Sequence, residues 1–272
     1  MRPFLKFIFL TVLVSWSCFV AAAAMGGGTL SPPTGAKIPG QAVFFLGVIA
    51  PSLVALALTA RSTGRRGVVA LLRQTIRGPT QIRWYVFAAG YMAVIKLAAA
   101  GFHRIWIGEW PAFGSVPVLL MVLAMAVSTP VQAGEEIGWR GYALPHLTAE
   151  FGLARASIAV GVVWALWHLP LFLIPGSDTY HQSFVVALLG IMALSVAMAW
   201  VYWRTNGSLF ITMLMHAAVN NTTTIVPSSR LPGTSPFTLS ASVVGWLTVA
   251  LLWICAAYFV IRMRSARLQP AP

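Results

Sequence analysis

Acidic side chains are scarce in this sequence, which has five Asp and Glu residues among 272. Charged residues of both signs make up 8% of the chain, whereas apolar residues make up 58% and the mean hydropathy is +0.82. Soluble globular domains carry roughly 25% charged residues, so this composition excludes that class. The sequence instead predicts an all-α polytopic membrane protein.

Cysteine is also scarce, since Cys18 and Cys255 are the two in the chain and lie in separate apolar runs. Such a pair forms no recognisable disulfide framework or metal motif. The net charge is +13, but the basic residues do not cluster on a polar domain as they do in nucleic-acid-binding proteins. We therefore predict no nucleic-acid partner.

Apolar runs long enough to cross a bilayer, about 20 residues each, predict eight transmembrane helices in one bundle. The whole chain, 1–272, reads as a single membrane domain. The predicted spans are 6–25, 41–60, 84–103, 115–144, 156–175, 184–203, 208–226 and 240–262.

The basic residues predict the orientation of these spans. With both termini in the cytoplasm, the cytoplasmic segments hold fourteen Lys and Arg residues and the outer segments hold three, Lys37, Arg104 and Arg230. This asymmetry follows the positive-inside rule. Lys96, the remaining basic residue, lies within a span and is expected to extend to the outer surface. Residues 1–25 are predicted to be the first transmembrane helix, and the alternative is a cleaved signal peptide.

Four ionisable side chains fall at similar depth in three different predicted spans: Glu135, Glu136, His168 and His216. If the fourth span continues as a helix to Leu144, Glu135 lies roughly 13 Å below the cytoplasmic surface, with His168 at roughly 18 Å and His216 at roughly 14 Å. Charged groups in hydrocarbon cost a few kcal/mol each, so such residues mark functional sites.

Local spacing adds three features to this cluster. Asn220 follows His216 by four residues, and Arg140 follows Glu136 by four, so each pair shares one face of a helix. Arg140 can therefore pair with the Glu136 carboxylate. Gly134 and Gly138 form a small-xxx-small pair, which allows a neighbouring helix to approach closely.

Two hydrolytic chemistries suit one carboxylate and two imidazoles. Glu135, His168 and His216 could bind Zn²⁺ with an open position for an activated water. Alternatively, a buried glutamate could take a proton from a water held by His168, while His216 and Asn220 stabilise the oxyanion. The residues alone leave both mechanisms open.

Three strings carry a family resemblance: EEIGWRG from Glu135, WALWHLP from Trp164, and HAAVN from His216. In this order they resemble the EExxxR, FxxxH and HxxxN motifs of the CPBP (CAAX prenyl protease type II, or Abi, bacteriocin-processing) family of intramembrane proteases. Trp164 stands where the second motif often has Phe. The resemblance covers a core of about residues 118–222.

The resemblance implies an intramembrane endopeptidase acting on membrane-associated peptides or proteins, in a bacterial inner membrane. It implies catalytic roles for Glu135, His168 and His216, with Glu136, Arg140 and Asn220 supporting them, and it leaves metal dependence open. The alternatives are an ion-coupled transporter, in which buried Glu and His form a cation path, and a catalytically silent membrane scaffold. No internal repeat of the kind common in transporters is evident.

Overall fold

The computed structural model describes residues 1–31, 37–227 and 235–264 of the chain. Within these ranges every regular element is a helix, which confirms the all-α class. Five helices are long and apolar enough to cross a membrane. They are α1 (Arg2–Met25), α2 (Lys37–Arg73), α3 (Ile82–Ile107), α9 (Phe184–Arg204) and α11 (Val243–Met263).

The predicted span 115–144 is a broken helix. It consists of α4 (Val118–Ser128), the 3₁₀ turn η1 (Pro130–Gln132), α5 (Ala133–Glu136), the π-helix η2 (Ile137–Ala143) and α6 (Leu144–Phe151). The axis bends by 41° after α4, where Pro130 cannot donate a backbone hydrogen bond. The expectation of one continuous helix to Leu144 was therefore wrong.

The two other predicted spans are present as shorter helices. The fifth becomes α7 (Leu153–Trp167) followed by α8 (Leu169–Leu173), and the seventh becomes α10 (Leu209–Thr222) followed by the 3₁₀ turn η3 (Thr223–Ile225). By length and composition, the described residues provide five membrane spans, or six if the broken helix is counted as one. The predicted arrangement of eight helices is compatible with this fold, but the count is not established by it.

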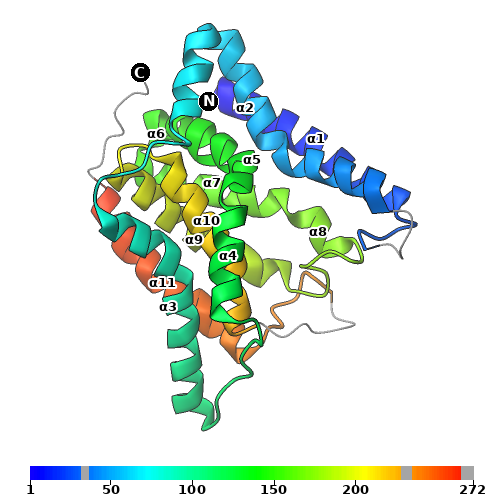
Figure 1. Ribbon diagram of the computed structural model, residues 1–272, viewed down its shortest axis with the longest axis vertical. Coiled ribbons are helices and arrows are strands. Elements are labelled where there is room, and N and C mark those ends of the chain that lie inside the picture. Colours follow the sequence, from blue (N-terminus) through cyan, green and yellow to red (C-terminus); the bar gives the residue numbers. More distant parts are fainter. Residues whose placement is uncertain (32–36, 228–234, 265–272) are drawn as a thin grey trace.

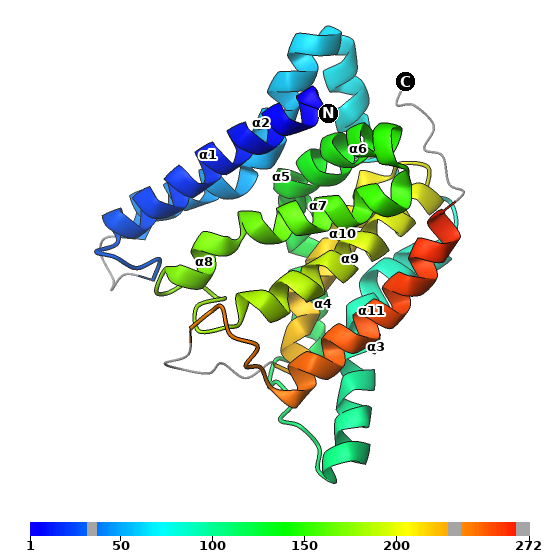
Figure 2. The same ribbon diagram turned by 180° about the vertical axis from the view of Figure 1, so that it is seen from behind.

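The helices form two layers. Figure 2 shows α1, α7, α9 and α11 side by side in this order, and neighbours in this row contact one another. The second layer contains α2, α5, α10 and α3, with α4 against α10 on its outer side (Figure 1). The main core cluster lies between the layers, and α5, η2, α7 and α10 meet there.

Helix α1 covers the inner helices through aromatic side chains. Phe7 packs edge-on against Trp139 with ring centroids 5.6 Å apart, and Phe19 packs against Trp167 at 5.6 Å. Pro51 within α2 cannot donate to the Gly47 carbonyl, and the Ser15 hydroxyl of α1 donates to this carbonyl at 2.8 Å. Burial of large aromatic rings and this hydrogen bond fix α1 against the bundle.

The loops gather at two ends of the bundle, as the charge pattern predicts. At one end, the Met1 ammonium pairs with Glu150, and the backbone amides of Leu209 and Phe210 donate to the Gln74 carbonyl. At the other end, Leu30 donates to Pro175, and Gly114 donates to Ile225. Each end therefore joins loops that the sequence assigns to the same side of the membrane.

Candidate active site

The site begins with the close packing of α5 and η2 against α2. A Cβ atom at Gly134 would lie 2.8 Å from Cγ2 of Ile49, and one at Gly138 would lie 2.7 Å from backbone atoms of Pro51. Only glycine allows this separation, so the expected close approach of a helix to the Gly134/Gly138 pair is confirmed. The Ser52 hydroxyl also donates to the Ala133 carbonyl at 2.6 Å.

Glu136 lies at the centre of a buried polar cluster. Its side chain is fully buried, and Oε1 accepts hydrogen bonds from Nη1 of Arg140 at 2.7 Å and from Nδ1 of His216 at 2.9 Å. The expected Glu136–Arg140 ion pair is thus present, although it spans a π-helix and not an α-helix. The second oxygen, Oε2, has no protein hydrogen-bond partner in the described part of the chain. Arg140 is fully buried as well, so it does not contribute to the surface charge that sets topology.

Glu135 has a different environment from its neighbour. It is 7% exposed, and its Oε2 accepts a hydrogen bond from the indole Nε1 of Trp164 at 2.8 Å. The ion pairs within 4 Å in the described residues do not include Glu135. Its carboxylate is therefore oriented by a neutral donor, while that of Glu136 is held by a cation and an imidazole.

Trp164 joins the helices of the site. Its ring lies 5.3 Å from the His216 ring and 5.9 Å from the His168 ring, measured between centroids. The Arg140 guanidinium carbon lies 4.2 Å from the centroid of the same indole, within the range of a cation–π contact. One tryptophan on α7 thus contacts side chains from α5, η2 and α10.

His168 follows α7 at the half-buried edge of the cluster. Its Nδ1 lies 2.8 Å from the Trp164 carbonyl oxygen, so the hydrogen-bond network assigns the proton to Nδ1. The same reasoning assigns the Nδ1 proton of His216 to its bond with Glu136. The Nε2 atom of each imidazole therefore carries no proton and can accept a hydrogen bond from a substrate or water. The charges of Glu135 and His216 lie within electrostatic range of His168.

Asn220 is placed apart from the other predicted residues. Its side chain is exposed, near the end of α10. Its neighbour Asn221 instead donates to the Ser128 hydroxyl at 3.1 Å and to the Ala217 carbonyl at 2.8 Å, which links α10 to α4. The structure thus gathers Glu135, Glu136, Arg140, His168 and His216, and leaves Asn220 outside their contacts. A substrate role for Asn220 stays a prediction.

The Zn²⁺ alternative was tested on the donor set. Imidazoles that donate from Nδ1 and keep Nε2 free are oriented as metal ligands commonly are. However, within the described ranges no three His, Cys, Asp or Glu residues lie close enough together to hold a metal ion. The set Glu135, His168 and His216 does not fit a three-ligand zinc site in this arrangement.

Sequence reasoning missed three features of the site. Trp164 was identified as the aromatic residue of the second motif, but its hydrogen bond to Glu135 was not foreseen. Met198 on α9, whose Sδ lies 3.1 Å from Nη2 of Arg140, was not considered. The π-helix that carries Trp139 and Arg140 was also missed. The one feature of the sequence that could have indicated it is its glycine content, with two Gly among seven residues. Such π-helical turns occur frequently at functional sites.

A comparison with known protein families matches this region. Residues 115–222, which include all six predicted site residues, match the family described as Type II CAAX prenyl endopeptidase Rce1-like. This segment is therefore similar to the CAAX prenyl endopeptidases, which supports the CPBP family. The recognition made from the three motifs is confirmed.

A second comparison finds a similar protein. The protein named CAAX prenyl protease 2 of Methanococcus maripaludis is 32% identical over 111 residues. The aligned part is 39% of this chain and 39% of the relative, so the similarity extends over less than half of either protein. The family model and this relative each match less than half of the chain.

Proposed function

We propose that this protein is an intramembrane endopeptidase that hydrolyses peptide bonds of membrane-associated peptides or proteins. The observation that carries the proposal is the unequal environment of two adjacent carboxylates, with Glu136 bound by Arg140 and His216 and Glu135 bound by Trp164. The Rce1-like segment and the relative named as a prenyl protease support the same activity.

In the proposed mechanism Glu135 is the general base. The Trp164 indole holds Oε2, and Oε1 takes a proton from a water whose other hydrogen bond is accepted by Nε2 of His168. A positioned carboxylate of this kind typically contributes 10²–10⁴-fold to a rate. The water oxygen then attacks the carbonyl carbon of the peptide bond.

His216 stabilises the tetrahedral oxyanion. When protonated on both nitrogens, it donates from Nε2 to the oxyanion while Nδ1 remains bound to Glu136. Glu136 acts on the ring as a buried carboxylate does on a catalytic histidine, since it fixes the tautomer and stabilises the imidazolium. Collapse of the intermediate breaks the C–N bond, and Glu135 returns its proton to the leaving amine. We retain Asn220 as a second donor, one helical turn beyond His216.

The test is peptide cleavage by the full chain reconstituted in lipid, with a panel of membrane-tethered peptides. Glu135→Gln preserves an oxygen acceptor for Trp164 but removes the base, so we expect cleavage to fall at least about 100-fold. Glu109→Gln, at an exposed acid outside the cluster, is the matched control and should cleave as the wild type does. Wild-type cleavage by Glu135→Gln would contradict the proposal.

A second arm addresses the metal. Protein freed of metal by chelation should retain full cleavage, because the mechanism uses side chains alone. Loss of cleavage on chelation that is restored by Zn²⁺ would contradict the metal-free mechanism, while leaving the peptidase assignment intact.

A further inference from the structure

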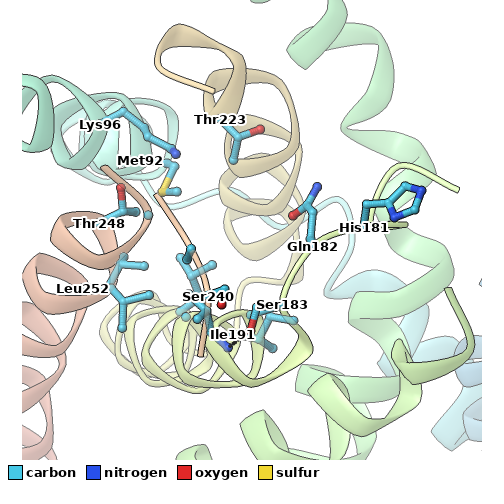
Figure 3. A pocket seen from close by; sticks show the side chains of 17 residues that line it. Met92, Lys96, His181, Gln182, Ser183, Ile191, Thr223, Ser240, Thr248 and Leu252 are labelled. Carbon is cyan, nitrogen blue, oxygen red and sulfur yellow. Dashed lines mark hydrogen bonds between the residues drawn. The ribbon is translucent and has the colours of Figure 1, made fainter. Parts of the chain in front are cut away.

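A cavity of about 200 Å³ lies among α3, α9 and α11, where loop residues 181–183 and 240–241 also line it. Figure 3 shows this cavity, with side chains from these elements directed around it. The site residues Glu135, Glu136, Arg140, His168 and His216 do not line it. The cavity is therefore separate from the proposed active site.

Lys96 contributes a buried charge to the wall of this cavity. Its side chain is 3% exposed, so the expectation that it extends to the outer surface was wrong. Among the described residues, the ammonium donates one hydrogen bond, to the Val226 carbonyl at 3.1 Å. The ion pairs within 4 Å in the described residues are formed by Met1, Arg140 and His216, and none involves Lys96.

A buried ammonium without an anion is costly. Lysine has three N–H donors, and the Val226 carbonyl accepts one of them. Transfer of a cation into a dry interior is unfavourable unless a counter-charge and further hydrogen bonds compensate it. An anion that enters the cavity would supply both.

Apolar and polar side chains are mixed around the cavity wall. In the view of Figure 3, the apolar side chain of Met92 lies beside Lys96, and Ser183 and Ser240 lie beside Ile191. Further apolar lining comes from Val186, Leu194, Val249 and Leu252. This lining suits a ligand with one small anionic group and a hydrocarbon chain.

We propose that this cavity binds a medium-chain fatty-acid-type carboxylate, with its carboxylate on the Lys96 ammonium and its chain against Ile191 and Leu252. The size agrees, because a dry cavity of about 150 Å³ holds a benzene molecule. A phosphate monoester carries nearly two negative charges at neutral pH. Lys96 is the one Lys or Arg among the lining residues that the structure describes, so a single carboxylate matches it better.

The proposal is tested by calorimetric binding of octanoate to the full chain in detergent, with octanol as the uncharged control ligand. Lys96→Met removes the ammonium and keeps an unbranched apolar side chain. We expect this variant to bind octanoate at least tenfold more weakly than the wild type, and to bind octanol within twofold of it.

A second variant fills the cavity instead of removing the Lys96 ammonium. Gly190 lines the cavity, and a Cβ atom there would meet Val249 Cγ2 at 3.9 Å, an ordinary contact. The backbone at Gly190 therefore has room for a Cβ atom. Thermal unfolding checks that Gly190→Leu folds, and its larger side chain should abolish binding of both ligands.

Three results would overturn the proposal. One is the absence of saturable octanoate binding to the wild type, and another is equal octanoate affinity in the wild type and either variant. The third is tighter binding of octyl phosphate than of octanoate, which would exclude the single carboxylate.

Discussion

At the scale of single residues, the two adjacent glutamates are distinguished by their neighbours. Glu136 is fully buried and accepts hydrogen bonds from a guanidinium and an imidazole. Glu135 is bound by a neutral indole. Glu136 accepts two hydrogen bonds, one of them from a cation, whereas Glu135 accepts one from a neutral donor, so Glu136 is the more tightly fixed of the two. This difference underlies the assignment of Glu135 as the base and Glu136 as the residue that orients His216.

Trp164→Phe tests the orientation of Glu135. Phenylalanine keeps an aromatic ring beside His168 and His216 but lacks the donor that binds Oε2. A hydrogen bond to a charged group contributes about 1.5–3 kcal/mol, so we expect kcat for peptide cleavage to fall about tenfold or more with KM unchanged. The measurement is steady-state cleavage in lipid. An unchanged kcat would show that the indole does not position the base.

Arg140→Met tests the buried ion pair. It leaves the Glu136 carboxylate without its cation, and breaking a buried pair in this way costs about 3–5 kcal/mol. We expect a clear decrease in thermal stability in detergent. The double variant Arg140→Met/Glu136→Gln removes both charges and should recover part of the loss. Equal stability of the wild type and the single variant would contradict a structural role for the pair.

At the scale of elements, the π-helix η2 positions the site against α2. Gly138 lies so close to Pro51 that an added Cβ would meet its backbone atoms at 2.7 Å. Backbone cannot rotate away as a side chain can, so α2 and η2 would have to separate.

Gly138→Ala should therefore lower thermal stability, by about 1–3 kcal/mol as overpacking generally does, and should reduce cleavage because α5 moves with η2. Gly90→Ala is the control, because a Cβ at Gly90 in α3 meets no heavy atom within 4 Å. It should be neutral or slightly stabilising, since alanine favours a helix over glycine. Similar losses in both variants would contradict the packing argument.

The packing of helix α1 supports a prediction about residues 1–25. Phe7 and Phe19 cover Trp139 and Trp167, the two tryptophans next to the site motifs. We expect residues 1–25 to be retained as a transmembrane helix, because their removal would expose these rings. The alternative prediction is that residues 1–25 are cleaved as a signal peptide.

At the scale of the whole molecule, the loops form two groups at opposite ends of the helices (Figure 1). We expect the group containing Met1, Gln74 and Glu150 to face the cytoplasm, because the predicted segments there hold most of the basic residues. The other group contains the loops near Leu30, Pro175 and Ile225.

Cysteine labelling of intact cells checks this orientation. In a background with Cys18 and Cys255 replaced by Ala, a membrane-impermeant maleimide should label Ser31→Cys and Ser235→Cys but not Ser62→Cys. All three native serines are exposed in the structure, so access differs only by membrane side. After cell lysis, Ser62→Cys should label as well. Labelling of Ser62→Cys before lysis would reverse the proposed topology.

The sequence by itself determined the membrane class and the all-α fold, and it predicted Glu135, Glu136, Arg140, His168 and His216, which the structure places together. Apolar runs and scarce charge leave few alternatives for a chain in hydrocarbon, where every backbone polar group must be satisfied within helices. The motifs were recognisable because rare Glu and His residues stand out against this background. Single-residue spacing also predicted the Glu136–Arg140 pair and the close packing at Gly134 and Gly138.

The tertiary structure alone decided which groups contact one another. The bend after α4 is local to Pro130, but the contacts that the broken helix makes with α2 and α10 join segments far apart in the chain. His216 on α10 forms its hydrogen bond with Glu136 on α5, and Glu135 on α5 accepts one from Trp164 on α7. Local spacing relates residues on one helix, but the rotation and register of neighbouring helices are set by side-chain packing across the whole bundle.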